Sequence, residues 1–276
     1  MLPERGTVNR AGTELVYWTW LGRGPATLLL HGIGNYGRYW DPFADAIRGR
    51  LRLIAPDARG HGESARPANG YVPAEFVADA LAVLDDVGVE RAVVVGHSMG
   101  GLHAINLAAR HPGRVRALVI VDTSPDPLPA GAERAQRLLT GRPARFANRN
   151  EARAYLERTS PGYAAGVYEN RLAFAFRDVN GELEWRSDPN ALARIMSGRL
   201  PAADRWDALA AVACPTLVVR GMRSNVLSDD VARRMAQTLA NGRLMELDAG
   251  HNVPLDRPRE LADAVVVLAT TPDLLP

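Results

Sequence analysis

A serine between glycines carries the clearest chemical signal in the sequence. Gly96-His97-Ser98-Met99-Gly100 matches the pattern G-x-S-x-G. The β-branched run Arg91–Val95 before it predicts a buried strand, and Gly101–Arg110 after it has helical periodicity. A chain that reverses from strand to helix within so few residues exposes the hydroxyl at the turn, and the helix N-terminus beneath favours developing negative charge. The motif therefore predicts Ser98 as the nucleophile of an acyl-transfer reaction.

A second glycine-rich loop supplies what such a nucleophile needs. His31-Gly32-Ile33-Gly34-Asn35 directly follows the strand expected at Ala26–Leu30. The tetrahedral intermediate of acyl transfer carries an oxyanion, which two backbone N–H groups stabilise when they point at one oxygen. We expect these groups to come from Ile33 and from Met99, the residue after the nucleophile.

These motifs, with the loop Pro56–Ser64 and the late pair Gly250-His251, resemble the α/β-hydrolase-fold serine hydrolases of the soluble esterase and lipase type. The resemblance extends over about the whole chain. It implies a mostly parallel eight-stranded sheet with helices on both faces, and a helical cap inserted between the sixth and seventh strands. It also implies that the catalytic residues follow the chain order serine, acid, histidine.

The histidine that fits this order is His251. Of the six histidines, only His251 lies beyond the last expected core strand, Arg243–Leu247, and we expect the other five to be structural. A neutral imidazole there would take the proton of Ser98 and later give it to the leaving group.

The acid departs from the common family pattern. Its usual position, the third residue after the glycine that ends the seventh strand, holds Ser224, and Asn225 follows; neither side chain is an anion. Asp122 directly follows the strand expected beside the nucleophile strand, and some esterases of this superfamily resemble this arrangement. We therefore expect Asp122 to orient His251. The alternative is a degenerate triad in which only the amide of Asn225 orients the histidine.

Strand-like and helical runs alternate along much of the chain, which predicts a parallel sheet covered by helices. Between Asp122 and Pro215 no strong buried-strand run occurs, and amphipathic pieces take its place. We predict an α/β core in residues 1–125 and 206–276, and a mainly helical cap in residues 126–205. Asn180-Gly181 within the cap predicts a type I′ hairpin.

The substrate pocket is predicted from the few aromatic residues, which make up 6% of the chain. Tyr36 and Trp40 follow the oxyanion loop, and Phe174 belongs to the cap. Together with Gly32 and Val253 they would form an apolar slot over the serine. The cap is also rich in arginine; interspersed acidic residues predict a salt-bridged surface, although an anionic substrate could use one or two of these arginines.

Composition excludes several other classes of protein. The formal charge of +2 argues against nucleic acid as a partner, the single cysteine excludes an internal disulfide, and no Cys/His spacing predicts zinc. Without any lysine, the chain has no Schiff-base residue. No apolar run approaches the ~20 residues of a membrane helix, and no signal-like run opens the sequence, so we expect a cytoplasmic enzyme without cofactor or membrane contact. Monomer and dimer both stay open.

The expected activity is hydrolysis of a small carboxylic ester, lactone or thioester through an acyl-Ser98 intermediate. One alternative is a non-hydrolytic enzyme on the same scaffold (a lyase, a cyclase, a cofactor-free peroxidase or a C–C-bond-cleaving enzyme), which the missing acid favours. The other is a hydrolase-like receptor whose ligand moves the cap.

Overall fold

The computed structural model describes residues 2–198 and 200–271, except the side chains of residues 130, 132, 134, 135 and 138. The outermost residues of the predicted core, 1 and 272–276, lie outside the described part. One sheet of eight strands, in the order β1-β2-β4-β3-β5-β6-β10-β11, organises the chain. The strands are β1 Glu4–Arg10, β2 Thr13–Trp20, β3 Ala26–Leu30, β4 Arg52–Pro56, β5 Ala92–His97, β6 Val115–Val121, β10 Thr216–Gly221 and β11 Gly242–Leu247.

From β4 to β11 in the sheet order all neighbouring strands are parallel, and only β2 runs antiparallel to its neighbours, β1 and β4. β1 was not predicted, because its residues are mostly polar and none is buried. A tight turn joins β1 to β2, with positive φ at Ala11 (50°) and Gly12 (80°), as expected for this hairpin.

Helices cover both faces of the sheet, and β5 shows why. Val93 and Val95 belong to one hydrophobic core, whereas Val94 belongs to the other, because successive side chains of a strand point to opposite faces. The first face packs against α1 (Asp41–Ile47) and α11 (Pro258–Thr270). The second face packs against four helices, α2 Pro73–Asp86, α3 Met99–Arg110, α8 Ala202–Ala210 and α9 Asp229–Thr238. The α/β-hydrolase architecture is thereby confirmed.

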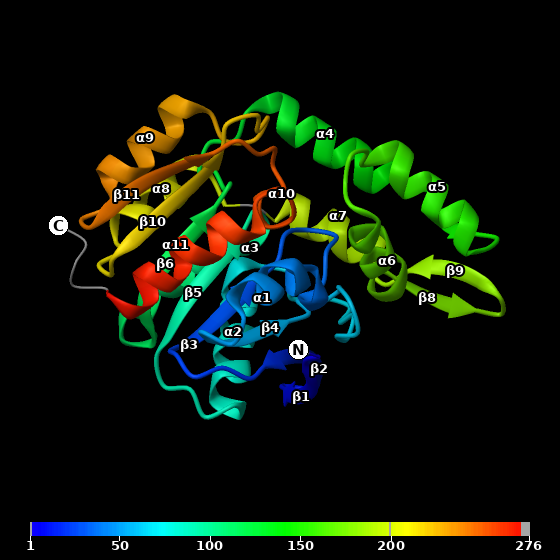
Figure 1. Cartoon of the computed structure of the whole chain (residues 1–276), viewed down its shortest axis with the longest axis horizontal. Helices are drawn as coiled ribbons and strands as arrows, with labels where there is room; N and C mark the ends of the chain where they lie inside the picture. Colours follow the sequence, from blue (N-terminus) through cyan, green and yellow to red (C-terminus); the bar gives the residue numbers. More distant parts are fainter. Residues whose placement is uncertain (1, 199, 272–276) are drawn as a thin grey trace.

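The segment between β6 and α8 departs from the alternation of sheet strands and helices, as predicted. Its elements lie together on one side of the sheet core (Figure 1). It is mostly helical but contains a small antiparallel sheet of order β7-β9-β8; the hairpin of β8 and β9 was predicted, whereas β7 was not. Its elements are α4 Pro129–Thr140, β7 Arg145–Phe146, α5 Arg149–Thr159, α6 Ala165–Phe174, β8 Phe176–Val179, β9 Glu182–Trp185 and α7 Pro189–Ser197. We call residues 126–205 the cap; their division from the core at these boundaries stays a prediction.

The hairpin of the cap has the expected turn, with φ of 56° at Asn180 and 87° at Gly181. The cap is anchored to the core by polar contacts of Asn170, on α6. Its side chain accepts a hydrogen bond from Tyr36 Oη at 2.8 Å and donates one to Asp41 Oδ2 at 2.7 Å. Apolar cap side chains, including Leu172, join the same core as α1 and α11.

Within residues 2–198 and 200–271, none of the helices has both the length and the apolar character needed to cross a bilayer.

Candidate active site

Ser98 is the single residue between β5 and α3, and its backbone is strained. Its φ of 54° and ψ of −119° lie outside the regions that side-chain-bearing residues favour. The reversal is possible because glycines, which have no side chain, lie on both sides of Ser98. A Cβ on Gly96 would lie 2.4 Å from the carbonyl oxygen of Gly100, and one on Gly100 would lie 2.2 Å from that of Leu30. The glycines thus allow the tight turn that presents Ser98.

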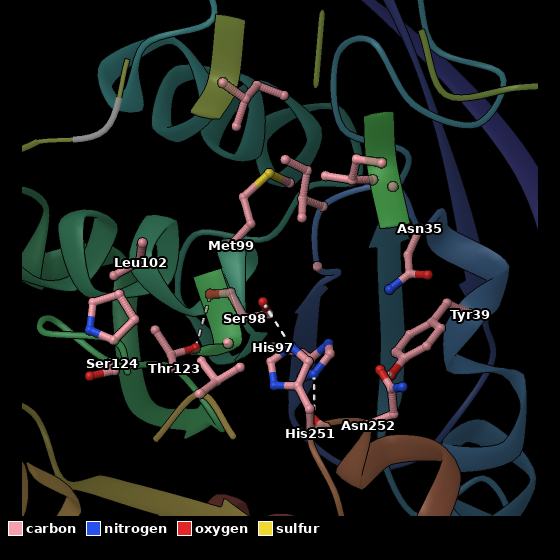
Figure 2. A pocket seen from close by; sticks show the side chains of 18 of the residues that line it. Asn35, Tyr39, His97, Ser98, Met99, Leu102, Thr123, Ser124, His251 and Asn252 are labelled. Carbon is pink, nitrogen blue, oxygen red and sulfur yellow. Dashed lines mark hydrogen bonds between the residues drawn. The ribbon is translucent and has the colours of Figure 1, made fainter. Parts of the chain in front are cut away.

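His251 lies beside this serine, in the loop between β11 and α10 (Val253–Asp256). Its Nε2 is 3.1 Å from Ser98 Oγ, and its side chain is 27% exposed. Figure 2 shows Leu102, Thr123 and Ser124 on one side of Ser98, and Asn35, Tyr39 and Asn252 on the other. The hydroxyl of Ser98 can donate to the neutral imidazole, which is the contact that proton transfer requires.

Asp122 is fully buried and completes a chain of hydrogen bonds with these two residues. Its Oδ2 is 2.7 Å from Nδ1 of His251, and its Oδ1 accepts a hydrogen bond from the Gly221 amide at 2.9 Å. The residue adopts an unusual φ of 45° at the end of β6. A carboxylate at Nδ1 fixes the proton there and leaves Nε2 free to accept the proton of Ser98.

Ser224, at the position where the family commonly has its acid, contacts the carboxylate of Asp122 instead. Its Oγ donates to Asp122 Oδ2 at 2.5 Å and accepts from the Val226 amide at 3.0 Å. The carboxylate of Asp122 therefore occupies the place that a longer acidic side chain at position 224 would fill. Asn225 lines the cavity, but the Nδ1 of His251 faces Asp122 and not this amide.

Ile33 and Met99 both line the cavity at Ser98. Met99 is the first residue of α3, so its amide has no acceptor within the helix. Gly32 lies against the nucleophile, since a Cβ built on it would come within 3.1 Å of the Ser98 Cβ. The two amides therefore border the space in which an acyl group attached to Ser98 would lie, and their role as an oxyanion hole stays a prediction.

His31 holds the loop of residues 31–35 in place. Its ring contacts the Gly32 carbonyl oxygen through Nδ1 at 2.8 Å, and its Nε2 accepts the Ala58 amide at 3.0 Å. Nδ1 must therefore carry the proton. Burial lowers the pKa of His31 to about 4, so the ring stays neutral, as these two contacts require.

Two residues that contact the site were not predicted. His97 was expected to be structural, but its ring lines the cavity, stacks on Tyr39, and has its Nε2 2.9 Å from the backbone oxygen of His251. Asn252 accepts a hydrogen bond from Tyr39 Oη at 3.4 Å and donates one to Tyr163 Oη, in the cap, at 3.0 Å. The sequence could have indicated both residues, because His97 directly precedes Ser98 and Asn252 directly follows His251. It gave no sign of the contact between Asn252 and Tyr163.

A cavity of about 620 Å³ lies over Ser98 and is lined by both core and cap. Among the five residues predicted to contact substrate, Gly32 lines it and the other four do not. Trp40 and Val253 are 0% exposed within the hydrophobic core, so the prediction for them is wrong. The prediction is also wrong for Tyr36 and Phe174, which do not line the cavity and whose ring centroids lie 6.3 Å apart.

Other residues of the cap line the cavity instead. They include Arg142, Tyr155, Tyr163, Arg171, Trp185 and Ile195. Their contribution depends on how the cap helices pack, which the sequence pattern does not specify.

Comparison with known proteins agrees with this fold. The profile of the alpha/beta hydrolase fold matches residues 25–258, so the chain belongs to the α/β-hydrolase family.

Two relatives show how widely the likeness extends. The chain is 31% identical to a 3-hydroxybutyrate-oligomer hydrolase of Cupriavidus necator, with 85% of each chain covered. It is 30% identical to an esterase of Mycobacterium tuberculosis, with 96% of this chain and 88% of the relative covered. Among solved structures, an E-2-(acetamidomethylene)succinate hydrolase superposes with a TM-score of 0.87 at 25% identity, over 95% of this chain and 97% of the other. The chain is therefore similar over nearly its whole length to hydrolases.

Proposed function

We propose that this protein is a serine hydrolase that cleaves a small carboxylic ester, lactone or thioester through an acyl-Ser98 intermediate. The observation that carries the proposal is the continuous hydrogen-bonded chain from Ser98 through His251 to Asp122, with separations of 3.1 and 2.7 Å. The names of the relatives, a hydrolase and an esterase, support the same reaction type.

In the first half of the reaction, His251 Nε2 takes the proton of Ser98 while Oγ attacks the substrate carbonyl. The negative charge that forms on the carbonyl oxygen is stabilised by the amides of Ile33 and Met99 and by the N-terminus of α3. His251, now protonated, is stabilised by Asp122. It gives its proton to the leaving alcohol or thiol, and acyl-Ser98 remains.

In the second half, a water molecule takes the place of the leaving group. His251 removes its proton as it attacks the acyl carbonyl, and the Ser98–acyl bond breaks with return of the proton to Ser98. The carboxylic acid is released and the enzyme is regenerated. The non-hydrolytic alternative was considered because the usual position of the acid holds Ser224. Since Asp122 lies beside His251, hydrolysis is the better supported reaction.

The test is hydrolysis of p-nitrophenyl acetate by the wild type and by Ser98→Ala. We expect turnover by the wild type and loss of at least about 10³ in kcat in the variant. Equal rates in the two proteins would overturn the proposal.

A further inference from the structure

Several arginines of the cap pair with carboxylates of the cap, and Arg142 does not. Most exposed ones form ion pairs with cap glutamates: Arg145 with Glu182 and Glu184, Arg149 with Glu169, Arg153 with Glu157 and Glu169, and Arg177 with Glu184. Arg142 differs, because it is half-buried, lines the cavity, and pairs with no carboxylate among the residues that the structure describes.

Neutral groups hold the guanidinium of Arg142 in place. It donates to the Oγ and to the backbone oxygen of Ser187, both at 2.8 Å, and lies 4.8 Å from the ring centroid of Trp185. These bonds use two of its five N–H donors. The group is thus fixed in orientation while donors are left for a further acceptor.

The charge of Arg142 is costly without a counter-ion. Burial lowers its pKa to about 10, which still leaves the guanidinium charged at neutral pH. The nearby Asp188 offsets part of this cost at a distance, but its carboxylate caps α7 by accepting the Asn190 amide at 3.0 Å. Buried charges in proteins are normally paired, so a missing partner at a cavity wall indicates a charged ligand.

The other charged side chains that line the cavity are also mostly positive. Among the described residues that line the cavity, four are arginines, Arg142, Arg171, Arg205 and Arg223, and one is acidic, Asp256. Arg223 is paired with Asp248, outside the lining, and Asp256 accepts a hydrogen bond from the Gly250 amide. A cavity with this balance favours an anion over a neutral or cationic ligand.

We propose that Arg142 binds a carboxylate carried by the substrate, so that the preferred substrates are esters, lactones or thioesters of a compound with a second, ionised carboxyl group. This inference rests on the proposed function, because the bond to be cleaved is the ester, lactone or thioester bond that Ser98 attacks. The three N–H donors that Ser187 does not use lie in the plane of the guanidinium, and two neighbouring donors of such a group match the geometry of a carboxylate.

The experiment compares substrates that differ only in this group. Monomethyl succinate, glutarate and adipate are paired with methyl butanoate, pentanoate and hexanoate, in which a methyl group replaces the carboxylate. Proton release at constant pH gives kcat/KM for the wild type, for Arg142→Gln, and for Arg145→Gln as a control, whose arginine lies in the exposed ion pairs of the cap.

We expect the wild type to prefer at least one anionic ester over its neutral partner by about tenfold or more. Arg142→Gln should lower kcat/KM for that anionic ester at least about tenfold and change the neutral ester less than about twofold. Arg145→Gln should leave both unchanged. The neutral ester also serves as the control for folding. No preference in the wild type, or an equal fall for both esters in Arg142→Gln, would overturn the inference.

A binding measurement separates failure of this inference from failure of the proposed function. Calorimetric titration of Ser98→Ala with monomethyl glutarate should give a dissociation constant that Arg142→Gln, added to the same background, raises about tenfold. If the wild type hydrolyses no ester but this difference persists, the proposed reaction fails and the anion site stands. If esters are hydrolysed and the difference is absent, the anion site fails.

Discussion

The Nδ1 of His251 lies 2.7 Å from Oδ2 of Asp122, although 129 positions separate the two residues in the chain. The contact forms because Asp122 directly follows β6 and His251 follows β11, and these parallel strands flank β10 in the sheet. The loops after parallel strands emerge at the same edge. The strand that commonly carries the acid, β10, contributes Ser224 instead, which donates to the same carboxylate oxygen.

Asp122→Asn should lower kcat by about 10³- to 10⁴-fold, as loss of the triad acid does when the fold is retained. An asparagine can still accept the Gly221 amide bond but can present an N–H to Nδ1, which favours the wrong tautomer of His251. The measurement is steady-state hydrolysis of p-nitrophenyl acetate. The matched control is Asn225→Asp, which should change kcat little; near-normal turnover in Asp122→Asn, or a large gain in Asn225→Asp, would show a degenerate triad.

Adding Ser224→Asp to Asp122→Asn should recover at least about tenfold in kcat over the single variant. The Ser224 Oγ already lies 2.5 Å from the Asp122 carboxylate, so a carboxylate from position 224 would reach the neighbourhood of His251. Ser224→Ala alone should cost less than about tenfold, since it removes one hydrogen bond and leaves the acid. Kinetics of all three variants test the idea, which is wrong if the double variant shows no recovery.

Gly96→Ala should destabilise the fold by at least about 2 kcal/mol, because the added methyl group would meet the backbone of Gly100 and overpack the turn. Gly166→Ala, on α6, is the control: nothing lies within 4 Å of the added Cβ, so the free energy of unfolding should change by less than about 1 kcal/mol, in the stabilising direction. Urea unfolding of both variants measures the effect. Equal stability of the two would contradict this account of the turn.

Acid should unfold the protein through its buried histidines. Burial lowers the pKa of His31 to about 4 and of His61 and His103 to about 3, whereas an unfolded histidine titrates near about 6.5. Below that pH the unfolded chain binds protons that the folded chain does not. The free energy of unfolding should therefore be largest above about pH 6.5 and fall toward about pH 4, by about 1.4 kcal/mol per pH unit for each histidine.

His103→Leu isolates one of these contributions, because neither ring nitrogen of His103 has a hydrogen-bond partner among the described residues and its ring stacks on Phe76. Urea unfolding at pH 7 and pH 5 should show that the variant loses about 2 kcal/mol less over this interval than the wild type. Identical losses would mean that His103 is protonated in the folded protein.

The parts of the fold that the sequence predicted are those with local signals. The run that forms β5, the glycines around Ser98 and the helical period of α3 are each visible within a few residues, and the structure has these elements where they were expected. β1 was missed because an exposed edge strand lacks apolar alternation. The two-residue strand β7 was missed because it exists only through its pairing with β9.

The site likewise has a part that the sequence could predict and a part that it could not. The proximity of Ser98 and His251 could be predicted because a motif and the chain order identify them. The pocket could not, since Trp40 and Phe174 have the same aromatic character whether they face a cavity or a core. Which of the two they face depends on contacts between cap and core, such as that of Asn170 with Tyr36, between residues 134 positions apart.

The most direct test of the central claim is labelling with a fluorophosphonate, followed by peptide mass mapping. The account predicts one covalent adduct on Ser98 in the wild type, none in Ser98→Ala, and a labelling rate in His251→Ala lowered by at least about 10³-fold. An unlabelled wild-type protein, or an adduct on a residue other than Ser98, would contradict it.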